Sequence, residues 1–126
     1  MRQVVHTDRA PKAVGPYSQA IKAGGFVWVS GQIPLDRSTG KLVDGGIEEQ
    51  AERALANLAT VLEGAGSGMN RVVRATLYLT DLEDFEAVNR IYATWFREAP
   101  PARVCVEVSR LPKAARVEID AVALEA

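Results

Sequence analysis

The sequence has very little of the two residue types that most often carry metal and redox chemistry. Its 126 residues include one cysteine, Cys105, and one histidine, His6. A disulfide within the chain is therefore impossible, and a zinc site of cysteines and histidines cannot form within one subunit. No phosphate-binding loop or dinucleotide fingerprint is present either. We expect no metal and no cofactor.

Strong net charge and long apolar runs are absent as well. The 15 basic and 16 acidic residues leave a formal net charge of −1, so no overall field gathers nucleic acid or an anionic membrane. No stretch of about 20 apolar residues exists to span a bilayer, and residues 1–6 lack the apolar run of a signal peptide. These features predict a reducing, cytoplasmic setting without a membrane or nucleic-acid partner.

The composition is that of one ordinary globular domain. Hydrophobic residues make up 48% of the chain and charged residues 25%, and this length is enough for a single core. No internal repeat, low-complexity tract or change of composition divides the sequence. We expect residues 1–126 to form one domain.

Strand-like and helix-like patterns alternate along the chain. Strands are predicted at 2–6, 18–23, 26–32, 71–80, 103–108 and 116–122, and helices at about 47–63 and 82–97. The Gly24-Gly25 dipeptide predicts a tight hairpin, and the apolar run 26–29 suggests a strand buried on both faces. A helix between two strands, twice over, implies right-handed crossovers and a parallel pair. Local rules alone would pair the last two strands.

The segment 101–112 alternates strictly between two kinds of side chain. One face carries three valines and the other an arginine, a thiol and a carboxylate: Val104, Val106 and Val108 against Arg103, Cys105 and Glu107. The valine face is expected to be a core face. The polar face either lies in solvent or is buried against another subunit, and the pattern alone leaves both open.

Four blocks of sequence, in this order, resemble the RidA/YjgF family of imine deaminases. They are Gly15–Ala20, Ser30–Pro34, Tyr78–Phe85 with Val88-Asn89 after it, and Pro101–Pro112 with Val117–Ala123. The resemblance implies an α+β fold of the chorismate-mutase-like type, a mixed sheet with two helices on one face, in which the last two strands are not paired. It also implies a homotrimer whose sheets close around a common centre. The sites would lie between subunits, with polar residues on the non-helix faces of the strands.

The function that the resemblance implies is hydrolysis of a reactive carbon–nitrogen double bond. The substrates would be 2-iminobutanoate, 2-iminopropanoate and similar imino acids, which become 2-oxo acids and ammonia before they damage pyridoxal-phosphate enzymes. Arg103 would bind the substrate carboxylate, for which its planar fork is suited. Glu118 would orient a water molecule and relay a proton.

The resemblance assigns substrate binding to five further positions: Tyr17, Ser30, Gly31, Asn89 and the backbone amide of Cys105. The residues themselves leave structural alternatives open at these sites. Arg103 could form a surface or interface ion pair, Cys105 could be a packed thiol, and Glu118 a solvated acid. A turn tyrosine and a strand-end serine would equally explain Tyr17 and Ser30.

Two other functions remain compatible with these blocks. The first is a trimer that binds 2-oxo acids through Arg103 without turnover. The second is an RNA-cleaving inhibitor of translation, against which the near-neutral charge and the lack of a stripe of aromatic and basic residues weigh. The segment between Phe96 and Pro101 is shorter than is common in the family, so the rim of the cleft and its substrate range are expected to differ.

Overall fold

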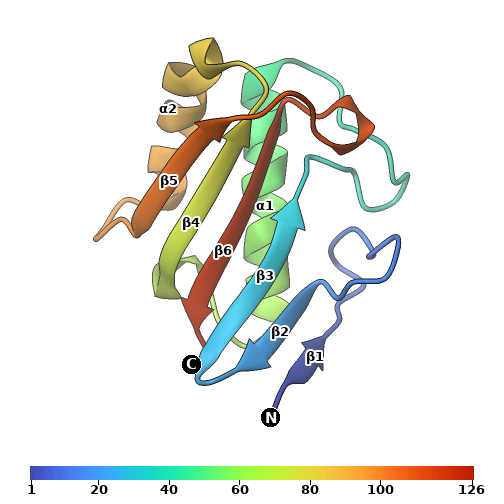
Figure 1. Cartoon of the computed structure of the whole chain (residues 1–126), viewed down its shortest axis with the longest axis vertical. Helices are drawn as coiled ribbons and strands as arrows, with labels where there is room; N and C mark the ends of the chain where they lie inside the picture. Colours follow the sequence, from blue (N-terminus) through green and yellow to red (C-terminus); the bar gives the residue numbers. More distant parts are fainter.

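The computed structural model describes residues 1–126, which form a mixed six-stranded sheet with two helices on one face (Figure 1). The strands are β1 (Gln3–Val5), β2 (Ala20–Ala23), β3 (Phe26–Gln32), β4 (Val72–Leu79), β5 (Ala102–Glu107) and β6 (Val117–Leu124), and the helices are α1 (Ile47–Gly64) and α2 (Phe85–Trp95). The predicted α+β class and the one-sided helical layer are confirmed. Neither helix combines the length and hydropathy needed to cross a membrane.

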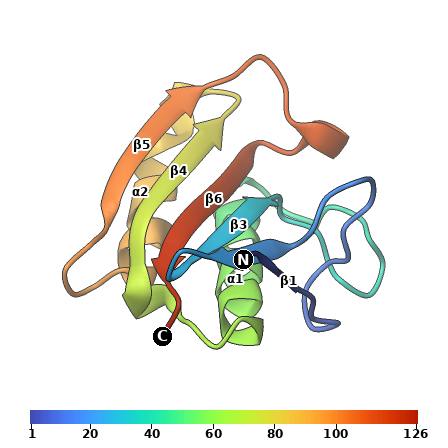
Figure 2. The same ribbon diagram turned by 60° about the horizontal axis from the view of Figure 1, so that its bottom comes forward.

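The order of strands in the sheet is β1-β2-β3-β6-β4-β5. Strand β6 lies between β3 and β4 and is antiparallel to both, whereas β5 is parallel to β4 at the edge of the sheet (Figure 2). The last two strands are therefore not partners, so pairing them by local rules is wrong. The crossover through α2 supplies the predicted parallel pair.

Two local features follow directly from glycine. In the β2–β3 hairpin, Gly24 and Gly25 have φ values of 64° and 84°. Residues with a side chain rarely adopt such values, which fit a tight primed turn. At the end of α1, Gly66 has a φ of 79°, and the Ser67 amide donates to the Leu62 carbonyl. This Schellman closure ends the helix, and a 3₁₀ turn at Met69–Arg71 then leads into the next strand.

Helix α1 supplies much of the core. Its inward stripe includes Leu55, Leu58 and Leu62, all of which are fully buried, and each contributes about 1.5–3 kcal/mol by leaving water. Gly46 precedes the first residue of the helix, and its backbone amide donates to the Glu49 carboxylate at 2.7 Å. The predicted bounds agree with the structure to within one residue.

Helix α2 is shorter than predicted because a 3₁₀ turn at Leu82–Asp84 precedes it. Asp81 begins this turn by accepting a hydrogen bond from the Glu83 amide at 2.9 Å. The side chain of Asp84, the residue immediately before α2, makes no capping bond and accepts two hydrogen bonds from Arg116 at 2.9 and 3.0 Å. The pair fastens the start of α2 to the start of β6.

The assignment of a core face to the valines of the 101–112 segment is wrong. Val104 and Val106 are 37% and 39% exposed, while Arg103 and Cys105 face α2 on the other side of β5. As β5 is an edge strand, the helix that covers one of its faces decides which face is buried. The apolar residues thus lie on the open face of the sheet.

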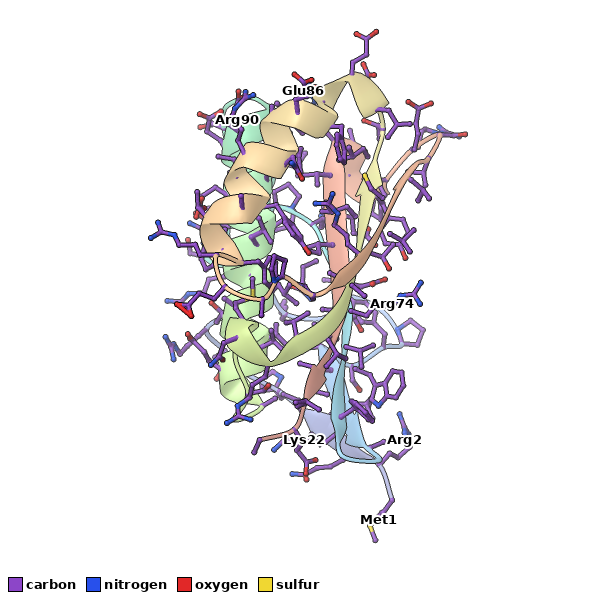
Figure 3. The ribbon with its side chains drawn as sticks, turned by 90° about the vertical axis from the view of Figure 1, so that its left-hand side faces the viewer. Met1, Arg2, Lys22, Arg74, Glu86 and Arg90 are labelled. Atoms are coloured by element: carbon purple, nitrogen blue, oxygen red, sulfur yellow. The ribbon has the colours of Figure 1, made fainter.

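The open face is otherwise mixed in character. Strand β6 alternates between residues buried under the helices and the partly exposed Glu118 and Asp120, and Asp120 accepts a hydrogen bond from the Tyr78 hydroxyl at 2.8 Å. Trp28 is 49% exposed on β3, so the expected burial of both faces of that strand is wrong. Figure 3 shows the two layers from the side, with Arg90 on the helix layer and Arg74 on the open face.

Candidate active site

The side chain of Arg103 is held by three residues of α2. Its guanidinium carbon lies 4.7 Å from the ring centre of Tyr92 and 5.4 Å from that of Phe85. Its Nη1 donates to the Asn89 side-chain oxygen at 2.8 Å. None of the three ion pairs in the chain involves Arg103. The guanidinium is therefore fixed by neutral groups, and its charge is left for a ligand.

Cys105 lies two residues further along β5 on the same face as Arg103. Burial raises the pKa of its thiol, although the neighbouring Arg103 charge acts in the opposite direction. The thiol is also packed against the hydrophobic core. A raised pKa disfavours the nucleophilic thiolate at neutral pH, which supports the interpretation of Cys105 as a packed side chain.

The backbone amide of Cys105 points toward the free edge of the sheet. The Val108 amide donates to the Leu79 carbonyl of β4, and amides of alternate residues in a strand point the same way. Val106 and Val104 therefore donate toward β4, whereas the amides of Arg103 and Cys105 point away from it. A donor next to the guanidinium is thus open to a ligand at the edge of β5.

The second candidate region is a pocket of about 470 Å³, which lies where β3 ends and β6 begins. Four of the residues named from the sequence line it: Tyr17, Ser30, Gly31 and Glu118. Glu118 reaches it from the open face of the sheet, and Tyr17 from the loop before β2. The structure thus brings these four residues together.

Glu118 lies directly against Gly31. A Cβ atom built on Gly31 would fall 2.8 Å from the Glu118 carboxyl carbon and closer still to one carboxylate oxygen. Only glycine leaves room for the carboxylate at this position. Burial, and secondarily the Asp120 charge, raises the pKa of Glu118. A carboxyl group whose pKa is raised toward neutral pH is better suited to exchange protons than a solvated carboxyl group.

The two hydroxyl groups of the pocket are only partly engaged. The Ser30 hydroxyl donates to the Ser18 carbonyl at 2.6 Å, which leaves its oxygen free to accept. The Tyr17 hydroxyl accepts a long hydrogen bond of 3.4 Å from the Val14 amide, and this side chain is 51% exposed. Both groups can therefore meet a ligand without breaking the fold.

Sequence reasoning missed several residues that line this pocket: Lys12, Gln19, Pro112 and Lys113. The Gln19 amide is buried and bonds the backbone of Thr7 and Pro11, so it holds the loop that carries Tyr17. It lies within the Gly15–Ala20 block, which was the available signal. Lys113 has a left-handed φ of 58°, a conformation that no periodic pattern reveals.

The candidate residues fall into two separate groups within one chain. Arg103 pairs with Ala75 of β4, and Glu118 pairs with Tyr78 on the other side of that strand. The two residues are thus two strand spacings apart across the sheet, about 10 Å, and three residues apart along β4, about another 10 Å, and their side chains lie on opposite faces. Asn89 and Cys105 accompany Arg103, and the remaining three candidates accompany Glu118.

These observations define a class of protein: a small mixed sheet with a pocket that holds a half-buried glutamate and, separately, an arginine that has no acidic partner. The sequence model of the family described as Endoribonuclease L-PSP matches residues 7–125. The chain therefore belongs to this family, which is also called RidA/YjgF, and the resemblance noted in the sequence is confirmed.

Individual relatives agree over almost the whole chain. A RutC family protein of Pyrococcus horikoshii is 51% identical over 98% of both chains. The mouse 2-iminobutanoate/2-iminopropanoate deaminase is 46% identical over 99% of this chain and 93% of its own. The crystal structure of Escherichia coli TdcF with bound serine superposes with a TM-score of 0.92 at 37% identity, covering 97% of this chain and 98% of that one.

Proposed function

We propose that this protein is a cofactor-free deaminase that hydrolyses short 2-imino acids to 2-oxo acids and ammonia. The observation that carries the proposal is an arginine with no acidic partner together with a half-buried glutamate of raised pKa. The first suits the carboxylate of an imino acid, and the second suits proton exchange at its carbon–nitrogen bond. The deaminase name of the mouse relative supports the same reaction.

The complete site is proposed to form between two subunits of a trimer. Within one chain, Arg103 and Glu118 lie on opposite faces of the sheet and cannot contact one small molecule. A neighbouring copy placed against the open face and the β5 edge would bring its Glu118 pocket to this Arg103. The partly exposed Val104 and Val106 would be covered by the same contact.

In the proposed reaction, Arg103 and the amide of Cys105 hold the substrate carboxylate. This places the adjacent imine carbon near Glu118 of the other subunit. Glu118 removes a proton from a water molecule as the water oxygen bonds to that carbon and passes this proton to the imine nitrogen, which gives a neutral carbinolamine. Glu118 then takes the proton of the carbinolamine hydroxyl and delivers it to the nitrogen, so that the carbon–nitrogen bond breaks, the carbonyl forms and ammonia leaves. Positioning supplies most of the rate enhancement, since an activated imine already reacts with water.

Tyr17 and Ser30 are proposed to orient the substrate and the water within the pocket. The Ser30 oxygen has an accepting position free, and the exposed Tyr17 hydroxyl can donate. Asn89 serves the site through Arg103, because its oxygen accepts from the guanidinium. The substrate would be supplied in the cytoplasm by a dehydratase, which releases an enamine that becomes the imine.

The proposal is tested by an assay in which a pyridoxal-phosphate dehydratase generates the imine and the release of the 2-oxo acid is measured. Purified protein should accelerate the release of 2-oxobutanoate from the imine, and Arg103→Ala should lose most of the acceleration. Binding of 2-oxobutanoate with no effect on imine decay would favour a non-catalytic binding trimer instead. Cleavage of RNA that persists in Arg103→Ala would favour the endoribonuclease activity for which the family is described.

A further inference from the structure

Three residues that contact Arg103 form one stripe on α2. Phe85, Asn89 and Tyr92 are spaced at i, i+4 and i+7, so they lie on one face of the helix. The outer two present aromatic rings to the guanidinium, and the middle one presents a carbonyl oxygen. The α2 stripe, defined by these three residues, is therefore a shaped support for one cation.

Every group of the α2 stripe is uncharged, in contrast to the support of another arginine in the chain. Arg116 is paired with Asp84 through two hydrogen bonds and joins two elements of the fold. A carboxylate beside Arg103 would likewise fix the side chain, but it would compete with an anionic ligand. Rings and an amide fix the guanidinium and leave its charge uncompensated.

Tyr92 is the most firmly held member of the stripe. The side chain is 5% exposed, and Phe96 packs behind it with ring centres 4.6 Å apart. Its hydroxyl is buried and has no hydrogen-bond partner. The contact with Arg103 is therefore made by the ring, and the hydroxyl contributes no visible bond to the site.

We infer that the Tyr92 ring is a positioning residue, which fixes the Arg103 guanidinium so that its free N–H edge meets the substrate carboxylate. This inference rests on the function proposed above. It makes a specific distinction between ring and hydroxyl. Loss of the ring should weaken carboxylate binding, whereas loss of the hydroxyl alone should not.

The test compares Tyr92→Leu with Tyr92→Phe in the full-length protein. Tyr92→Leu should raise KM for 2-iminobutanoate and the Kd of 2-oxobutanoate about tenfold, as expected for loss of a partly desolvated cation–π contact. Tyr92→Phe should change both by less than about twofold, because the ring remains. Trp95→Leu is the matched control, since it removes an aromatic side chain of α2 that does not contact Arg103.

A double-mutant cycle shows whether Tyr92 acts through Arg103. In an Arg103→Ala background, Tyr92→Leu should leave the residual binding of 2-oxobutanoate unchanged. If Tyr92→Leu does not fold, Phe85→Leu replaces it, because that partly buried ring contacts the same guanidinium.

Three results would overturn the inference. They are equal effects of Tyr92→Leu and Trp95→Leu, weakened binding in Tyr92→Phe, and an undiminished effect of Tyr92→Leu without Arg103. Imine decay in the presence of the wild-type protein distinguishes failure of the proposed function from failure of this inference. If this protein does not accelerate imine decay, the reaction is rejected, while binding of 2-oxobutanoate still tests the role of Tyr92.

Discussion

Arg103 and Glu118 occupy opposite faces of the same sheet, separated by strand β4. Each has surroundings that suit one half of a hydrolytic reaction. The guanidinium is held without a counter-ion, and the carboxyl group is held in a pocket where its pKa is raised. Their separation leads to the composite site proposed above and to the predictions that follow.

Replacement of Arg103 should weaken carboxylate binding. Arg103→Ala removes a charged hydrogen bond worth about 1.5–3 kcal/mol, so we expect kcat/KM to fall by about 10- to 150-fold. Arg103→Lys should recover only part of the loss, because an ammonium cannot form the planar fork. Arg90→Ala is the control: it removes an arginine from the exposed side of α2 (Figure 3). A wild-type rate for Arg103→Ala in the coupled oxo-acid assay would contradict the role.

Replacement of Glu118 should slow turnover but stabilise the fold at neutral pH. Glu118→Gln removes the proton acceptor, and a decrease in kcat of about 100-fold is expected. The pKa of Glu118 is raised in the folded protein above its ordinary value of 4.5, mainly by burial. The ionised group therefore destabilises the fold once the pH exceeds this raised pKa, and the variant escapes that cost.

Thermal unfolding at two pH values checks the sign of this effect. At pH 7, Glu118→Gln should melt at a higher temperature than the wild type. Below the ordinary pKa of 4.5, Glu118 is protonated in both the folded and the unfolded state, so the difference should vanish. Equal melting temperatures of Glu118→Gln and the wild type at pH 7 would show that the buried, ionised carboxylate does not destabilise the fold.

Much of the fold could be predicted because local signals agree with it. The apolar stripe of α1 and the Gly24-Gly25 turn each specify one conformation, and both were found within a residue or two. The faces of β5 could not be predicted in this way. Its valines and its polar residues alternate equally well, and only the placement of α2 decides that Arg103 and Cys105 face the helix layer.

The candidate site was predicted as a set of residues but not as two groups. Spacing along the chain shows that Arg103 and Cys105 share a face, since both lie on one strand. It does not show that Glu118 points to the opposite side, because that depends on the order of β6, β4 and β5 in the sheet. The support of Arg103 by Tyr92 was missed for the same reason: the tyrosine reads as core at helical spacing.

Introduction of a side chain at Gly31 should disable Glu118 without unfolding the protein. The added methyl of Gly31→Ala would overlap the Glu118 carboxylate, which must turn away from the pocket. We expect kcat to fall as far as in Glu118→Gln, with circular dichroism unchanged. Gly46→Ala is a suitable control, since its methyl would meet no atom closer than 3.7 Å. Full activity of Gly31→Ala would show that Glu118 has no role in the reaction.

Removal of the Cys105 thiol should have little effect on turnover. The pKa of the thiol is raised by burial, and the proposed ligand is the backbone amide, which Cys105→Ala retains. We expect kcat/KM to stay within about threefold of the wild type, and alkylation by iodoacetamide at pH 7 to be slow. Rapid alkylation with a parallel loss of activity would instead identify the thiol as a nucleophile.

The composite site is tested most directly by mixing two inactive subunits. Arg103→Ala and Glu118→Gln chains carrying different affinity tags are co-expressed, and trimers containing both are purified through the two tags in succession. If each site takes Arg103 from one subunit and Glu118 from the next around a threefold ring, every mixed trimer contains one intact site. Such trimers should show about one third of the wild-type activity. Mixed assemblies no more active than either parent would contradict a site shared between subunits.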